Sequence, residues 1–102
     1  MSNSILNITI APEVVRTLVR NTVLAMPGIM AIADTDREKR NGVLVKLEPG
    51  DCATVNLRLI ASPDVALHEL GKQVQDMVVS VSEEVAGLCV TQVDIVFENV
   101  RK

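Results

Sequence analysis

The chain has almost no aromatic residues: Phe97 is the single one, and tryptophan and tyrosine are absent. Proteins that bind single-stranded nucleic acids stack the bases on aromatic side chains, and this sequence offers no set of rings for that purpose. A net charge of -3 and an isoelectric point near 5.0 also argue against a polyanionic partner. The composition therefore predicts no nucleic-acid partner.

Side chains that carry acid–base or metal chemistry are equally scarce. The chain has one histidine, His68, and two cysteines, Cys52 and Cys89, and none of them lies in a ligand or nucleophile motif. Neither a Walker pattern nor G-x-G-x-x-G occurs, so no phosphate-binding loop is indicated. We expect no enzymatic activity, no catalytic residue, no metal site and no cofactor. Cys89 is interpreted as a small apolar residue at a strand start, and Cys52 as an exposed thiol in a turn.

Long hydrophobic runs are also missing. No segment approaches the roughly 20 apolar residues of a membrane-spanning helix. The opening MSNSILNITI has no basic segment followed by an uninterrupted apolar stretch, so no secretory signal is expected. Two cysteines are too few for a disulfide framework, which favours a reducing compartment. We therefore expect a cytoplasmic protein that does not insert directly into a membrane.

Aliphatic residues are what the chain has in abundance. Hydrophobic residues make up 48% of its 102 positions, which excludes an intrinsically disordered protein. A chain of this length buries enough surface to fold without disulfides or metal. We predict a single domain over residues 1–102.

Hydrophobic periodicity divides the chain into five strands and two helices. Period-two alternation predicts strands over 6–10, 43–47, 55–61 and 90–97, and a short apolar segment at 29–33 is a weaker candidate. The first helix is predicted to begin at Pro12 and to end before Pro27-Gly28. Its expected buried residues are Val14, Val15, Leu18, Thr22, Ala25 and Met26.

The second helix has start and stop signals of its own. We predict that it begins at Pro63, is capped by the Ser62 side chain, and ends before a left-handed Gly87. Its expected buried residues are Leu67, Leu70, Val74, Met77 or Val78, Val81 and Val85.

The order β-α-β-β-β-α-β favours an α+β fold of two layers, with a mixed sheet and both helices packed on one face. Pro49-Gly50 predicts an antiparallel hairpin between the strands at 43–47 and 55–61. The right-handed crossover rule makes the strand after Gly87 parallel to the one before Pro63, provided that both share the sheet.

The uncovered face of this sheet is the candidate functional surface. Apolar residues alternate there with charges of both signs, a pattern typical of surfaces that dock on proteins. Exposed apolar residues without a function are the alternative interpretation. Cross-strand charge pairs are expected between Lys46 or Arg58 and Asp94 or Glu98. The candidate interaction residues are Leu44, Lys46, Arg58, Ile60, Asp94 and Val96.

Several segments, taken in order, resemble the alkaline shock protein family, also called envelope stress response or general-stress proteins of mainly Gram-positive bacteria. They are Ile8–Val15, Pro27–Ile29, Gly42–Val45 and Val74–Ile95. The most specific piece is Ala86-Gly87-Leu88 followed by alternating valines. One residue and one segment depart from the family pattern: Leu6 replaces a frequent glycine, and Ala61–Asp64 replaces a frequent aromatic-glycine pair.

The resemblance implies a non-enzymatic, cytoplasmic interaction or scaffold protein, linked to envelope or alkaline stress, that acts through protein–protein contacts. It also implies a protein partner, in some members a separate membrane anchor protein, and a homo-oligomer is a further expectation. The family supplies no established catalytic residues to carry over. The alternative is a small-molecule-sensing α/β regulatory module with a ligand site at a subunit boundary, which a saturable thermal stabilisation by a metabolite would distinguish.

Overall fold

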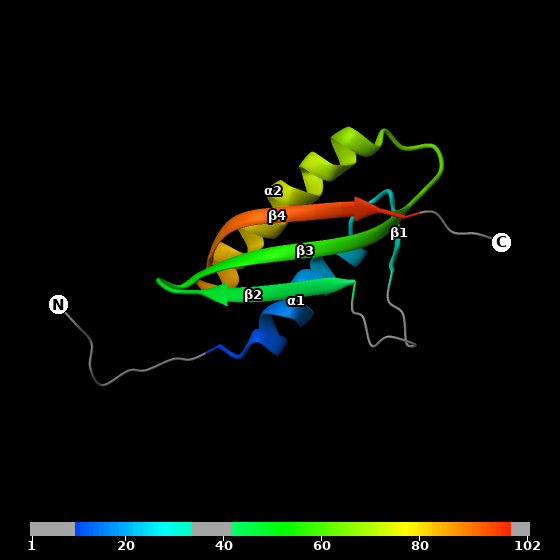
Figure 1. Cartoon of the computed structure of the whole chain (residues 1–102). Helices are drawn as coiled ribbons and strands as arrows, with labels where there is room; N and C mark the ends of the chain where they lie inside the picture. The colour runs from blue at the N-terminus through cyan, green and yellow to red at the C-terminus, as the bar shows by residue number, and fades with distance from the viewer. Residues whose placement is uncertain (1–9, 34–41, 99–102) are drawn as a thin grey trace, which may run out of the picture.

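The computed structural model describes residues 10–33 and 42–98. Its elements are α1 (Pro12–Leu24), β1 (Ile29–Ile32), β2 (Val43–Glu48), β3 (Cys52–Ala61), α2 (Leu67–Ala86) and β4 (Cys89–Phe97) (Figure 1). The strand expected over 6–10 lies outside the described residues, except for Ile10, which is in no strand. Among the described residues, no helix is long and apolar enough to cross a membrane.

β3 is the strand on which the sheet is built, because the other three strands all pair with it. β4 runs parallel along one edge, from the pair Cys52–Cys89 to the pair Leu59–Phe97. β2 and β1 follow one another along the other edge, and both are antiparallel to β3. The sheet is therefore mixed, and it contains the hairpin and the parallel crossover expected from the sequence.

β1 and β2 meet at Arg58, near the C-terminal end of β3. The Arg58 N–H donates to the Gly42 carbonyl oxygen and the Arg58 carbonyl accepts from the Ala33 N–H, both at 2.8 Å. A Cβ at Gly42 would collide with the Ile32 side chain. Glycine therefore allows the close approach that places both strands on one edge.

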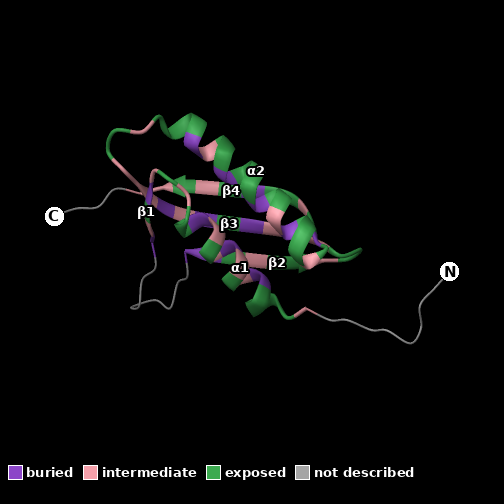
Figure 2. Cartoon of the chain, turned by 180° about the vertical axis from the view of Figure 1, so that it is seen from behind, coloured by how far each residue is buried: buried purple, intermediate pink, exposed green. Residues whose placement is uncertain are grey.

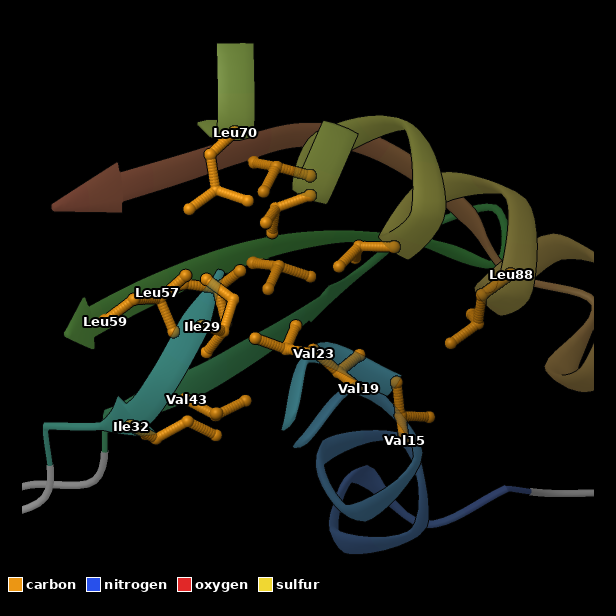
Figure 3. Close-up of a cluster of buried hydrophobic side chains, with 14 residues drawn as sticks. Val15, Val19, Val23, Ile29, Ile32, Val43, Leu57, Leu59, Leu70 and Leu88 are labelled. Carbon is orange, nitrogen blue, oxygen red and sulfur yellow. The ribbon is translucent and has the colours of Figure 1, made fainter. Parts of the chain in front are cut away.

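Both helices pack on the same face of the sheet, and the opposite face is uncovered (Figure 2). α1 lies over β1 and β2, α2 lies over β4, and the two helices contact each other. A single cluster of aliphatic side chains fills the space between the layers (Figure 3). Its fully buried members include Val15, Val19, Val23, Val43, Val55, Leu57, Leu59, Val74 and Val78. The α+β two-layer fold predicted from the sequence is confirmed.

The buried face of α1 differs from the prediction. Val15, Val19 and Val23 face the core, whereas Val14 is 58% exposed. Apolar residues occur on most sides of this helix, so periodicity alone does not select a face. The side of α1 that packs against the sheet and α2 is the one formed by residues four apart, Val15, Val19 and Val23.

α2 begins at Leu67 rather than at Pro63, so the prediction that Ser62 caps it is wrong. The N-cap is Ala66, with no side-chain hydrogen bond. Ser62 instead donates its backbone N–H to the Gly28 carbonyl oxygen at 2.9 Å, which ties the chain beyond β3 to the residue before β1. This bond continues the β1–β3 pairing one residue beyond β3, and α2 begins only at Leu67.

The buried stripe of α2 is also narrower than predicted. It consists of Leu70, Val74, Val78 and Ser82, each four residues apart. Ser82 is fully buried, and its Oγ has no hydrogen-bond partner among the described residues. Of the predicted members, Leu70, Val74 and Val78 are buried. Leu67, Val85 and Met77, which was the alternative to Val78, are exposed, and Val81 is half-buried. The prediction was based on aliphatic side chains, whereas the residues that are buried are those spaced by four along the side facing the core, and one of them is a serine.

Two glycines of the α2 segment allow a matched test. Gly87 ends the helix with φ 66°, as predicted, and has open space around it, whereas a Cβ at Gly71 would meet Phe97 at an ordinary 3.6 Å. Gly87→Ala should lower the free energy of unfolding by about 1 kcal/mol because alanine resists the left-handed conformation. Gly71→Ala should raise it by up to about 1 kcal/mol because alanine favours a helix interior. Denaturant unfolding of both variants tests this, and effects of the same sign would contradict it.

Candidate functional site

The uncovered face carries all six residues predicted from the sequence, and the strand register arranges them in rows. Leu44, Asn56 and Asp94 form one row across the sheet, since each is paired with the next. Side chains of registered residues point to the same face, so each row presents three neighbours. The adjacent rows are Lys46–Thr54–Gln92 on one side and Arg58–Val96 on the other. In Figure 1 this face is turned toward the viewer, with the helices behind it.

Two aliphatic side chains of this face are open to solvent. Leu44 on β2 and Val96 on β4 are both 54% exposed. Ile60 is half-buried and lies opposite Ala31 of β1. The apolar area is therefore discontinuous, and it is strongest at the two edges of the sheet.

One of the predicted charge pairs is present. Nη2 of Arg58 and Oε2 of Glu98 lie 2.5 Å apart, and Arg58 Nε donates to the same oxygen. Glu98 is held in place because its N–H donates to the Leu59 carbonyl oxygen at 2.7 Å. Both side chains remain about one-third exposed, 33% and 30%. Solvent screening therefore limits the pair to about 1 kcal/mol or less.

Lys46 and Asp94 do not pair within the chain. β3 lies between their strands, so two strand spacings, about 10 Å, separate them. Asp94 accepts a hydrogen bond from Gln92 Nε2 at 2.9 Å instead. Lys46 has no ion-pair partner among residues 10–33 and 42–98. Lys46 on β2 and Asp94 on β4 are thus exposed on opposite edges of one face. Glu48 lies two residues beyond Lys46 on β2, opposite Cys52.

The two cysteines form a pair that the sequence analysis missed. Cys52 and Cys89 are register partners at the first residues of β3 and β4. Their chain neighbours Ala53 and Val90 pack toward the core, so both cysteines face the uncovered side. Cys52 is half-buried and belongs to a strand rather than a turn, and Cys89 is exposed rather than an apolar filler. The sequence predicted that these two strands run parallel, and pairing their first residues would have placed the two cysteines side by side.

Contact between the cysteines alters the chemistry of Cys52. A side-chain hydrogen bond with Cys89 is the largest cause that raises the pKa of the Cys52 thiol, followed by burial and by the negative charges of Asp51 and Glu48. The Cys52 thiol donates its hydrogen bond to the Gly50 carbonyl oxygen, 3.4 Å away. Cys52 therefore keeps its proton at neutral pH.

Few side chains in the described residues could form a metal site or act in acid–base catalysis. His68 is exposed on α2. Within the described part of the chain, no three histidine, cysteine or carboxylate side chains are grouped as metal ligands.

A groove runs between the two helices on the side away from the sheet. It has a volume of about 750 Å³ and a largely apolar lining. Its lining residues are Thr22, Ala25, Met26, Pro27, Gln73, Asp76, Met77 and Ser80.

The fold has close counterparts among solved structures. The C-terminal domain of MamM in a cadmium form superposes with a TM-score of 0.63 at 13% identity, covering 89% of this chain and 100% of that one. A copper form of the same domain gives 0.61 at 13% identity, with 87% and 98% covered. At such low identity this likeness shows the fold alone. A search of curated proteins finds no significant match.

The family follows from the whole sequence rather than from the fold. Residues 1–102 match the model of the alkaline shock protein 23 family, which is described as having a cell envelope-related function. The chain belongs to this family, as the resemblance of its segments implied.

The cysteine contact makes a testable prediction about pH. The thiol of Cys52 should react with iodoacetamide with a pH midpoint above that of an ordinary cysteine, because its neutral form is favoured. Cys89→Ala should move this midpoint downward, since it removes the largest cause of the raised pKa. Mass spectrometry of the Cys52 peptide across neutral to alkaline pH measures both profiles, and identical midpoints would contradict the contact.

Proposed function

We propose that this chain is a non-enzymatic interaction protein of the envelope stress response, and that it acts through contacts made by the uncovered face of the sheet. The family gives the envelope-related role in its coarse form. The observation that carries the finer proposal is the face itself. Exposed Leu44 lies beside Lys46 on β2, exposed Val96 lies beside Asp94 on β4, and neither charge has an ion-pair partner among the described residues. The location that fits is the cytoplasm, with a protein partner providing the link to the envelope.

The partner that we propose for this face is a second copy of the chain. Lys46 on one edge and Asp94 on the other carry opposite charges, so these two positions of the face are complementary to each other in a second copy. A two-fold axis parallel to β3 places β2 of one copy over β4 of the other, with the sheets about 10 Å apart. Lys46 then comes within reach of Asp94 of the other copy, and Leu44 comes close to Val96.

Such an interface would bury the aliphatic side chains and pair the charges left open in the single chain. The charges contribute mainly orientation and selectivity, because docking the two copies in a different orientation would place like charges opposite one another. The aliphatic contacts contribute the attraction that does not depend on salt.

A charge exchange tests this arrangement. Lys46→Asp and Asp94→Lys should each weaken self-association by at least about tenfold, because each single variant places like charges opposite one another. An equimolar mixture of the two variants should associate again, since both contacts in the mixed dimer join opposite charges. Sedimentation of each variant and of the mixture measures this.

A matched control uses the exposed Val14 on α1, where Val14→Asp should leave association unchanged. A mixture as weakly associated as its components, or a wild-type chain that stays monomeric at every concentration, would overturn the homodimer.

The groove between the helices favours one alternative, the small-molecule-sensing module. Met26 and Met77 line it with flexible apolar side chains that adapt to varied ligands. Saturable thermal stabilisation by a metabolite, abolished by Met77→Glu, would support this function in place of the interaction face.

A further inference from the structure

The two cysteines at one end of the uncovered face form a chemical site of their own, independent of the interaction proposed above. We propose that Cys52 and Cys89 are a redox site at which a hydroperoxide oxidises the pair to an intramolecular disulfide, and which a dithiol reductant reopens. The parallel register of β3 and β4 places the two cysteines opposite each other.

The backbone already brings the pair within bridging distance. Adjacent strands lie about 4.8 Å apart, and disulfides join Cα atoms separated by about 4.4–6.8 Å. The Cys89 N–H donates to the Asp51 carbonyl oxygen at 2.9 Å, which fixes the start of β4 against the residue before Cys52. A small adjustment at two strand ends is then sufficient for closure.

The two sulfur atoms differ in access, which assigns their roles. Cys89 is exposed and meets the peroxide first, whereas Cys52 is half-buried beside it. The Cys89 thiolate attacks a peroxide oxygen: an S–O bond forms, the O–O bond breaks, and the leaving oxygen departs as water or an alcohol. The Cys52 thiol then gives up its proton and attacks the Cys89 sulfur, so that an S–S bond forms and the sulfenic hydroxyl leaves with that proton as water.

The electrons and protons balance over the two steps. The pair of thiols loses two electrons and two protons, and the hydroperoxide accepts both. With hydrogen peroxide as the oxidant, the products are one disulfide and two molecules of water. No metal or other cofactor takes part.

The disulfide would close the crossover from β3 through α2 to β4 into a covalent loop. Closing a long loop restricts the unfolded chain. The oxidised protein should therefore unfold at a temperature higher by about 5 °C or more. Oxidation would thus fix the sheet edge and α2 together without altering the packed core.

Treatment of the full chain with stoichiometric hydrogen peroxide tests the site. The wild type should lose the mass of two hydrogen atoms, remain a single chain on a non-reducing gel, and recover both thiols with dithiothreitol. Cys52→Ser should accumulate a sulfenic acid on Cys89 that dimedone traps. Cys89→Ser should consume peroxide more slowly than Cys52→Ser.

A matched control keeps two cysteines but breaks the register. In Cys89→Ser with Gln92→Cys, the second thiol lies farther along the same face of β4, opposite Thr54. This variant should form no intramolecular disulfide. The proposal is overturned if the wild type gives only sulfinic acid or intermolecular disulfides, or if the control closes as readily as the wild type.

Discussion

The structure depends on one constraint: β3 pairs with every other strand of the sheet, so its alternating side chains serve both layers at once. Ala53, Val55, Leu57 and Leu59 point beneath the helices and form the centre of the core. The residues between them, from Cys52 to Ile60, point to the uncovered face. Because the period of a strand is two, a shift of one residue would send the whole core set to solvent. The packing of the core thus fixes which side chains the open face displays.

This coupling explains which features could be predicted from the sequence. The face of each central strand was predictable, since alternation allows only two choices and burial selects one. The buried faces of the helices were harder to predict, because α1 has apolar residues on most sides and α2 buries Ser82 in preference to Val81 or Val85. The start of α2 was missed because the backbone of Ser62 bonds to Gly28, a partner distant in the sequence.

The site shows the same division between local and long-range information. All six predicted residues do share one face, because that depends only on strand parity. Which of them touch depends on strand order. Arg58 meets Glu98 because β3 and β4 are neighbours, whereas Lys46 and Asp94 are separated by β3. The pairing of Cys52 with Cys89 is likewise a result of parallel register, and neither cysteine has a local motif that indicates it.

The central claim is that this chain works through the uncovered face of the sheet, while the outer surfaces of the helices remain in solvent. Methyl resonances followed on increasing protein concentration test this most directly, since exposed aliphatic residues occur on both surfaces. Leu44 and Val96 report on the sheet, and Val14 and Val85 report on the helices, where they are 58% and 67% exposed. The account predicts concentration-dependent shifts at Leu44 and Val96 and none at Val14 and Val85. Shifts confined to the two helical valines, or resonances that never change with concentration, would contradict it.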